Sequence, residues 1–209
     1  MRVAPEGYPF MAVAWAIVLV LVAGGWWIGA LIWLPVAVWV VAFFRDPVRE
    51  GPRGDKFLIA PADGKVVSVL QSIDEPDFHG QSVVRVAIFM NVFNVHVNRY
   101  PARGTVTYRQ DNPGRFFNAA SEKASLENEQ NSIGLETPGG KILIRQIAGL
   151  VARRIVTDHA GGVDVAQGQR MGLIRFGSRV DLFIPRSAKI LVSVGDRTKA
   201  GETVVATWT

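Results

Sequence analysis

The sequence predicts a mainly β domain that follows a hydrophobic helical hairpin. Three observations lead to this fold class. Residues 10–44 contain no charged side chain, which is typical of a membrane segment. Residues 57–209 contain short apolar runs separated by turn residues, the pattern of a β-rich domain. Residues 45–56 are rich in Pro, Gly and charge, and we interpret them as a linker between a membrane anchor at 1–44 and the β domain.

Composition limits the possible chemistry and partners. The chain has 209 residues, no Cys and a formal net charge of +5. The lack of Cys excludes disulfides and thiolate catalysis. Arg2 and Glu6 cancel, so the positive charge belongs to the part beyond residue 44 and suggests an anionic partner. No dense Lys/Arg run with interleaved aromatic residues is present, so we expect anionic lipid as the partner and no nucleic acid.

The apolar segment is too long for one straight helix across a bilayer. The 35 residues of 10–44 would extend about 52 Å as a helix, against a hydrocarbon core of about 30 Å. Gly24-Gly25 offers a break that leaves a short piece, 10–23, and a piece adequate for crossing, 26–44. We therefore predict a hairpin, spanning or re-entrant, with Trp26 and Trp27 near an interface. A cleaved signal peptide is the alternative, but the apolar run is longer than a signal core.

Basic residues set the expected orientation of the hairpin. They follow the apolar segment directly, at Arg45, Arg49, Arg53 and Lys56. Positive flanks stay on the cytoplasmic side of a membrane. We therefore expect an inner or cell membrane protein whose β domain lies in the cytoplasm. Pro47 ends the second helix, because proline disfavours helix in the residue before it.

Strands are predicted from apolar runs bounded by turn residues. Before a polar, irregular segment at 111–131, these runs are Phe57–Ala60, Lys65–Leu70, Val83–Phe89, Asn91–Asn98 and Gly104–Tyr108. After it, they are Ile133–Glu136, Lys141–Ile147, Arg153–Val156, Gly172–Phe176, Val180–Ile184, Lys189–Val192 and Thr203–Thr207. Residues 60–67 and 192–205 resemble the edges of a barrel-sandwich hybrid, the architecture of lipoyl and biotinyl carriers. The attachment turn of such carriers is absent, so we predict a shared architecture without a shared function.

Gly177-Ser178 lies between two of these apolar runs and could carry chemistry. A glycine leaves its carbonyl sterically open. The hydroxyl of the following Ser can reach that carbonyl carbon and attack it if a base removes the hydroxyl proton. The dipeptide alone is more commonly an ordinary turn between strands. The dipeptide lies within a longer string from Met171 to Phe183, MGLIRFGSRVDLF.

Three His residues could supply the base. His79 lies in a turn-like polar stretch, and we expect it to be solvated. His159 precedes a Gly-rich turn and is the second choice, with Asp158 beside it. His96 lies in an apolar alternating run that we expect to be a strand, and is the first choice. Apolar neighbours would tune its pKa, and nearby Asn side chains could hydrogen-bond there; these are Asn91, Asn94 and Asn98.

Residues 45–209 resemble the phosphatidylserine decarboxylase family, in particular its compact prokaryotic branch. Four segments carry the resemblance: Arg45-Asp46-Pro47 with Pro61-Ala62-Asp63-Gly64-Lys65; Asn94-Val95-His96; Pro113-Gly114 with Lys123 and Asn128-Glu129; and Met171-Gly172 with Phe176-Gly177-Ser178. The chain departs from longer bacterial members at Arg99, where they have a second His, and at Gln130 and Arg179. One His therefore serves both cleavage and decarboxylation, or another residue covers one of the two roles.

The resemblance implies a self-processing enzyme. It implies that Asp63 orients His96, that His96 takes the proton of Ser178, and that the chain is cut between Gly177 and Ser178. The products, 1–177 and 178–209, would stay associated. Ser178 would become a covalent pyruvoyl group, the only cofactor, with no metal. An Asp in a Pro-x-Asp-Gly turn also commonly caps its own turn, so Asp63 has a purely structural alternative.

The resemblance also implies substrate and partners. The substrate would be phosphatidylserine, the products phosphatidylethanolamine and carbon dioxide, and the partners a membrane and further copies of the chain in a homo-oligomer. Arg115 or Lys123 could meet the lipid phosphate. Phe116 and Phe117 could enter the membrane interface.

Other functions fit the sequence less well. A zinc peptidase would need a His-x-His pair, and this chain has Asn94 and Asn98 at those positions around His96. A membrane-anchored β domain without enzymatic activity would account for the hairpin but not for the string from Met171 to Phe183. A pyruvoyl decarboxylase for another amino-acid head group would also cut itself but would not need residues 10–44.

Overall fold

The computed structural model describes residues 2–115, 119, 127–149, 154–175 and 177–208. Contacts within the chain divide it into two compact units, Met1–Val48 and Arg49–Thr209. The division lies inside the segment that we interpreted as a linker. Each unit is described by itself.

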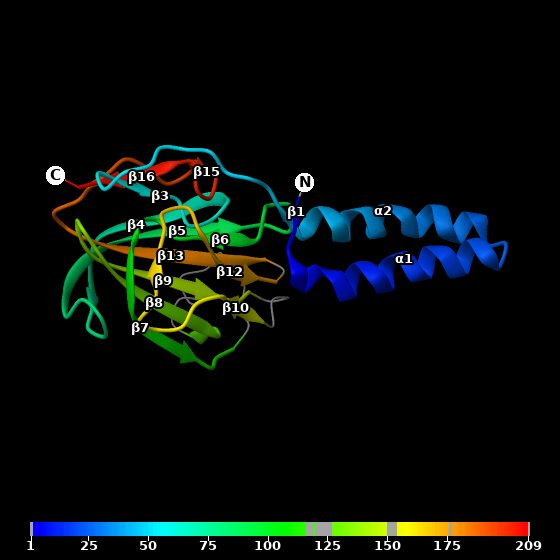
Figure 1. The fold of residues 1–209 in the computed structure, drawn as a ribbon, viewed down its shortest axis with the longest axis horizontal. Helices are drawn as coiled ribbons and strands as arrows, with labels where there is room; N and C mark the ends of the chain where they lie inside the picture. The colour runs from blue at the N-terminus through cyan, green and yellow to red at the C-terminus, as the bar shows by residue number, and fades with distance from the viewer. Residues whose placement is uncertain (1, 116–118, 120–126, 150–153, 176, 209) are drawn as a thin grey trace. The chain divides into compact units, whose positions relative to one another are not determined.

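The first unit is a pair of antiparallel apolar helices (Figure 1). A short 3₁₀ turn, η1 (Pro5–Gly7), leads into α1 (Tyr8–Ala23), and α2 (Trp27–Phe43) returns. Gly25 lies between them with φ +75°, a left-handed conformation that favours glycine. The Trp33 indole N–H donates to the Ala14 carbonyl at 3.0 Å. The predicted hairpin of apolar helices is confirmed.

The two ends of the hairpin are held together. β1 (Arg2–Val3) pairs in antiparallel fashion with β2 (Arg45–Asp46). A pair of helices closed in this way enters and leaves an apolar layer on the same side. The end of the hairpin that carries Arg45 and the N-terminal end therefore share one side.

The first helical stretch is longer than expected. Among the described residues, Pro5–Ala23 is the one stretch that is long and apolar enough to cross a membrane, and Trp27–Phe43 is a shorter apolar helix. We expected the piece 10–23 to be short for a crossing, and this was wrong. The first helix extends ahead of residue 10, because Pro9 is tolerated in the first turn.

The second unit consists of β-strands in three antiparallel sheets, and the predicted mainly β fold class is confirmed. The largest sheet has the strand order β11-β7-β8-β9-β13-β5-β4-β15, and the others are β10-β12-β6 and β14-β16-β3. The bounds are β3 Phe57–Ile59, β4 Gly64–Glu75, β5 Gln81–Met90, β6 Val97–Arg99, β7 Gly104–Asn112, β8 Gln130–Thr137, β9 Gly140–Ile147, β10 Ile155–Thr157, β11 Asp164–Val165, β12 Arg170–Ile174, β13 Ser178–Pro185, β14 Lys189–Ile190, β15 Arg197–Thr198 and β16 Val204–Thr207.

β13 lies at the centre of the largest sheet. It pairs with β5 on one side and β9 on the other, as Figure 1 shows for the orange strand. Successive side chains of a strand point to opposite faces. Val180, Leu182 and Ile184 therefore face the main apolar core, while Phe183 packs in a smaller cluster on the other face. The strand is buried on both faces, and its first residue is Ser178.

The predicted strand over Asn91–Asn98 was wrong for most of its length. β5 ends at Met90, and a turn follows in which the Phe93 N–H donates to Asn91 Oδ1 at 2.9 Å. The Asn91 N–H donates to Asn94 Oδ1, also at 2.9 Å. Short Asn side chains that bond to nearby backbone compete with the strand ladder. His96 therefore comes directly before the short strand β6 instead of lying inside a strand.

Candidate active site

The Gly177-Ser178 peptide lies at the start of β13, just after β12. Gly177 has φ +59°, in the left-handed region that favours glycine. Ser178 is fully buried and pairs in register with Met90 at the end of β5. Its Oγ has no hydrogen-bond partner among the described residues. A buried hydroxyl left unsatisfied costs about 1–3 kcal/mol, which makes this atom a candidate for chemistry instead of support.

His96 lies beside the chain that leads to this peptide. The imidazole is fully buried, and the His96 carbonyl accepts a hydrogen bond from the Ile174 N–H at 3.4 Å. The ring nitrogen Nδ1 is 3.0 Å from the Asn94 carbonyl oxygen. A carbonyl can only accept, so in the neutral ring Nδ1 carries the proton and Nε2 carries the lone pair. This tautomer is the one that a general base acting through Nε2 requires.

Buried amide side chains join the strands around Ser178. Asn98 on β6 contacts the Met90 sulfur at 3.6 Å and accepts from Gln146 Nε2 at 2.8 Å. Thr157 on β10 donates to Gln146 Oε1 at 3.3 Å. We had expected Asn98 to lie near His96 as a hydrogen-bonding residue. Gln146 and Thr157 were missed, although a lone Gln within the apolar run 141–147 was a signal that could have found the first of them.

Asp63 is buried in a turn beside β6, where the Arg99 N–H donates to the Pro61 carbonyl at 2.9 Å. Its two carboxylate oxygens accept from Arg49 Nη2 and from the Ala200 N–H, each at 2.7 Å. These are its hydrogen bonds within the described part of the chain, and neither goes to His96. The orienting contact to the imidazole therefore stays a prediction. The Arg49 partner was missed, because Arg49 was interpreted as part of the linker.

The other two His residues, His159 and His79, make their contacts with residues other than Ser178. His159 Nε2 is 2.9 Å from Gln169 Nε2, and its Nδ1 is 3.3 Å from the Tyr100 hydroxyl. Burial, with Asp158 nearby, raises the pKa of Tyr100 to about 12. Asp158 pairs with Arg170 at 2.9 Å. Both ring nitrogens of the second-choice base are thus occupied by this separate cluster.

His79 is half-buried, so the expectation that it is solvated was wrong. Its ring stacks edge-on against Phe78, with 5.5 Å between ring centroids. The Glu75 carboxylate accepts the backbone N–H groups of Phe78 at 3.0 Å and His79 at 2.9 Å, and so holds the turn against the sheet. Burial lowers the pKa of His79, and the nearby Glu75 charge opposes this shift.

Asn128 and Glu129, from the third segment of the resemblance, bond to the backbone of Ala148 just after the end of β9. Asn128 Nδ2 donates to the Ala148 carbonyl at 2.7 Å, and the Ala148 N–H donates to the Glu129 carbonyl at 3.0 Å. Arg115 is exposed, 3.7 Å from Glu127, and its backbone bridges to Asn128. The other proposed lipid contacts, Phe116, Phe117 and Lys123, lie outside the described residues.

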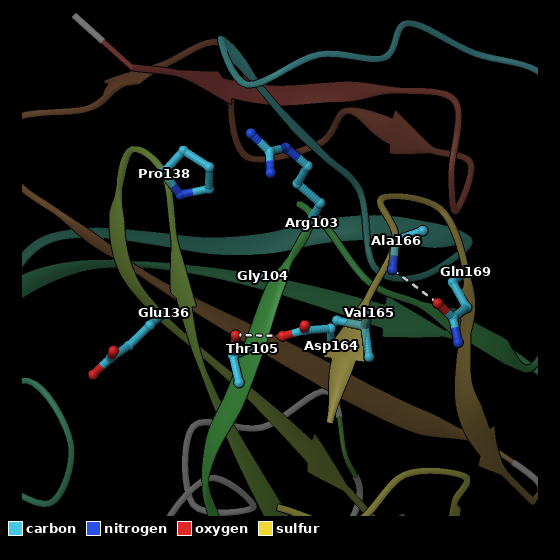
Figure 2. Close-up of a pocket in the computed structure, with 9 residues that line it drawn as sticks. All are labelled: Arg103, Gly104, Thr105, Glu136, Pro138, Asp164, Val165, Ala166 and Gln169. Atoms are coloured by element: carbon cyan, nitrogen blue, oxygen red, sulfur yellow. Dashed lines mark hydrogen bonds between the residues drawn. The ribbon is translucent and has the colours of Figure 1, made fainter. Parts of the chain in front are cut away.

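Cavities do not single out the predicted site. A cavity of about 630 Å³ lies elsewhere, and Figure 2 shows the hydrogen bond between Thr105 and Asp164 in its wall. Its lining contains none of the predicted site residues; it consists of Arg103, Gly104, Thr105, Glu136, Pro138, Asp164, Val165, Ala166 and Gln169. A smaller cavity of about 250 Å³ is lined in part by Pro113, Glu129 and Ile155. This cavity borders the segment that bonds to Ala148.

Among the described residues, no cluster of three or more His, Asp and Glu side chains is placed to hold a metal ion. The arrangement places a buried hydroxyl next to a glycine carbonyl, and a buried imidazole in the base tautomer directly before the short strand β6. That combination can perform an attack by the chain on its own backbone.

Two comparisons with known proteins bear on the function of this chain. The family model described as phosphatidylserine decarboxylase matches residues 36–206. The protein called phosphatidylserine decarboxylase proenzyme in Magnetococcus marinus is 48% identical over 204 residues, which cover 96% of this chain and 93% of that protein. The region matched by the family model contains Asp63, His96, Gly177 and Ser178.

Proposed function

The chain belongs to the phosphatidylserine decarboxylase family, and we propose that it is a proenzyme that cuts itself between Gly177 and Ser178. The mature enzyme then converts phosphatidylserine to phosphatidylethanolamine and carbon dioxide. The observation that carries the proposal is the buried Ser178 hydroxyl, which has no hydrogen-bond partner among the described residues and follows a glycine in the matched region.

Self-cleavage begins with proton transfer. His96 Nε2 takes the proton of Ser178 Oγ, and Oγ bonds to the Gly177 carbonyl carbon. The carbon–nitrogen bond of the peptide breaks, the nitrogen takes up a proton, and the amide has become an ester. Loss of the α-proton of residue 178 then expels the Gly177 carboxylate, which keeps the former Ser oxygen. Water finally replaces the nitrogen of the resulting dehydroalanine, which leaves as ammonia and completes the pyruvoyl group.

The surroundings of Ser178 fit such a group. A pyruvoyl carbonyl at position 178 supplies an acceptor for the electrons that are released when carbon dioxide leaves. Because Ser178 Oγ bonds to no described residue, removal of the hydroxyl leaves no buried donor or acceptor without its partner. His96 is the candidate to return a proton to the α-carbon of the product, since its ring is buried beside the same chain segment.

Asp63 is proposed as a positioning residue for His96. The turn that contains Asp63 lies beside β6, and β6 is the strand that begins directly after His96. Its carboxylate is anchored by Arg49 and Ala200, so the turn is held firmly. A fixed negative charge near this strand stabilises the imidazolium that forms when His96 takes the Ser178 proton.

The two products of cleavage are proposed to stay together. The piece 178–209 contains β13, which lies between β5 and β9 of the longer piece. Two more of its strands pair with the longer piece, β15 with β4 and β16 with β3. Breaking the peptide at the start of β13 leaves all of these ladders intact, so the two chains separate only when the domain unfolds.

The helical hairpin is proposed to hold the enzyme at the cytoplasmic face of the cell membrane. Its surface is apolar, and Trp26 and Trp27 are exposed at the turn between the helices. Exposed Arg115, or Lys123, is proposed to meet the lipid phosphate, and Phe116 and Phe117 are proposed to enter the membrane interface. A homo-oligomer is proposed as the working form.

Product formation tests the proposed function. The purified full chain is mixed with phosphatidylserine in detergent micelles, and carbon dioxide and phosphatidylethanolamine are measured. The wild type should form both in equal amounts, and Ser178→Ala should form neither. Pretreatment with a reagent that reacts with carbonyls should stop the wild type. Equal product formation by Ser178→Ala would refute a pyruvoyl group at this position.

A further inference from the structure

Gly149 lies against the peptide bond that is proposed to break. A Cβ atom added at Gly149 would be 1.9 Å from the Gly177 carbonyl oxygen and 3.0 Å from its carbon. The sheet explains this approach: β9 pairs with β13 so that Ile147 is opposite Arg179, and the chain continues along the same line. The two glycines therefore face each other directly beyond the last residue pair of the ladder.

Space, and not backbone conformation, requires glycine at this position. Gly149 is not among the glycines with positive φ, so alanine could adopt its backbone without strain. Real Cβ atoms do not approach within 3.0 Å, and the obstacle is backbone that cannot rotate away. The next atom is the Ala119 Cβ, at 3.2 Å from the added atom. Gly177 is the opposite case, with φ +59° and nothing within 4 Å of an added Cβ.

Asn128 holds Gly149 in place through the preceding residue. The buried Asn128 side chain donates to the Ala148 carbonyl at 2.7 Å, and that carbonyl belongs to the peptide that joins Ala148 to Gly149. On the other side, the Ala148 N–H donates to the Glu129 carbonyl at 3.0 Å. The peptides on both sides of Ala148 are thus each held by one hydrogen bond to the segment 128–129, and the one from Asn128 fixes the peptide that leads into Gly149.

We propose that Gly149 is a positioning residue for self-cleavage, and that Asn128 supports it. Resting on the proposed function, this inference assigns a role to the Asn128-Glu129 segment, which the cleavage chemistry left unused. Attack requires Ser178 Oγ about 3–3.5 Å from the carbonyl carbon, with the carbonyl correctly turned. Gly149 sets how far the Gly177 oxygen can swing and leaves room for it as the carbon becomes tetrahedral. Its Cα–H also lies close enough for a weak contact with that oxygen.

Gly149→Ala tests the proposal, with Gly161→Ala as the matched control. Gly161 also lacks a positive φ, and an added Cβ there meets no atom within 4 Å. Each full-length protein is made in a cell-free system, and the fraction cut between Gly177 and Ser178 is followed by intact-mass spectrometry. We expect Gly149→Ala to cleave about 10²-fold more slowly, the cost of an error of about 1 Å in placement. Gly161→Ala should match the wild type.

Hydroxylamine identifies the step that is lost, because it splits an ester but leaves an ordinary peptide intact. Uncut Gly149→Ala should resist hydroxylamine at this bond, since the misplaced carbonyl is not attacked. Cleavage of Gly149→Ala at the wild-type rate would overturn the proposal. So would accumulation of an ester that hydroxylamine splits, because attack would then have succeeded.

A second variant covers the case in which Gly149→Ala does not fold. Asn128→Ala leaves the space at Gly149 unchanged and removes the hydrogen bond to the Ala148 carbonyl. We expect it to melt as one folded species and to cleave about 10-fold more slowly, the effect of one hydrogen bond of about 1.4 kcal/mol. Cleavage at the wild-type rate would refute the supporting role. If the wild type itself stays uncut, the proposed function fails instead, so the two failures are distinguishable.

Discussion

Substitutions of the two partners in the Arg49–Asp63 ion pair can distinguish a structural role of Asp63 from a role in self-cleavage. Asp63→Asn removes the charge and keeps the size of the side chain, while Arg49→Met removes the partner and keeps the carboxylate. The two side chains are 7% and 12% exposed, with Arg49 Nη2 at 2.7 Å from Asp63 Oδ2. If Asp63 supports His96 by its charge, the two variants should lose similar stability but should differ strongly in self-cleavage.

The loss of stability can be worked from the contacts. Removing one partner of a buried ion pair costs about 3–5 kcal/mol, because the other charge is left buried. Arg49 keeps Glu202 at 3.3 Å when Asp63 is changed, and Asp63 keeps the Ala200 N–H when Arg49 is changed. We therefore expect about 3 kcal/mol for each variant, at the lower end of that range. Urea unfolding monitored by circular dichroism measures it.

The rate of self-cleavage should separate the two variants. Asp63→Asn should slow it by about 10²- to 10⁴-fold, the usual contribution of a group that supports a general base. Arg49→Met should cut itself within about threefold of the wild-type rate at a temperature where both variants are folded, since its carboxylate is still present. Intact-mass spectrometry of freshly made protein gives both rates. Equal slowing in both variants, or a wild-type rate for Asp63→Asn, would show that Asp63 acts only as a structural residue.

Three further predictions concern the base, the hairpin and acid stability. His96→Ala should accumulate uncut chain, because its rate of self-cleavage should fall about 10²- to 10⁴-fold. Intact-mass spectrometry measures this rate, and a wild-type rate would make His159 the next residue to test. Deletion of residues 1–44 should leave self-cleavage unchanged but lower carbon dioxide release on liposomes, because the anchor concentrates the enzyme at its lipid; equal loss on a short-chain soluble lipid would contradict this. Burial lowers the pKa of His79 in the folded protein below its usual 6.5. The group therefore contributes stability above pH 6.5, and this contribution is lost as the pH falls through the pKa of the folded state. The unfolding free energy of His79→Gln should therefore fall less than that of the wild type when the pH is lowered. Urea titrations above and below about pH 6 measure this fall, and an equal fall in both proteins would refute the assignment.

The strands that the sequence predicted best are those with continuous apolar runs. Val83–Phe89 and Val180–Ile184 lie within β5 and β13, because these strands are buried on both faces and apolar periodicity is strong there. The run Asn91–Asn98 misled, because its apolar residues alternate as in a strand. The side-chain oxygen of Asn94 accepts from the Asn91 N–H, and the side-chain oxygen of Asn91 accepts from the Phe93 N–H. Local hydrogen bonding by short polar side chains outweighed the apolar pattern.

The candidate site was predictable only as far as its residues could be named one by one. Ser178 and His96 were found from the motif and prove to be fully buried. Their setting depends on contacts between residues far apart in sequence, such as Arg49 with Asp63, Asn128 with Ala148 and Gly149 with Gly177. No local sequence signal pointed to Gly149. A side chain is excluded at this position by the Gly177 carbonyl, which comes almost 30 residues later in the chain.

The mass of the purified wild-type protein shows whether the chain cuts itself between Gly177 and Ser178. We expect two chains in equal amounts, 1–177 with an ordinary carboxyl end and 178–209 with a blocked start. The smaller chain should be lighter than a fragment that begins with Ser by the mass of one ammonia, and Ser178→Ala should give one uncut chain. An uncut, active wild type, or a smaller chain that begins with an intact Ser, would rule out a pyruvoyl group formed from Ser178.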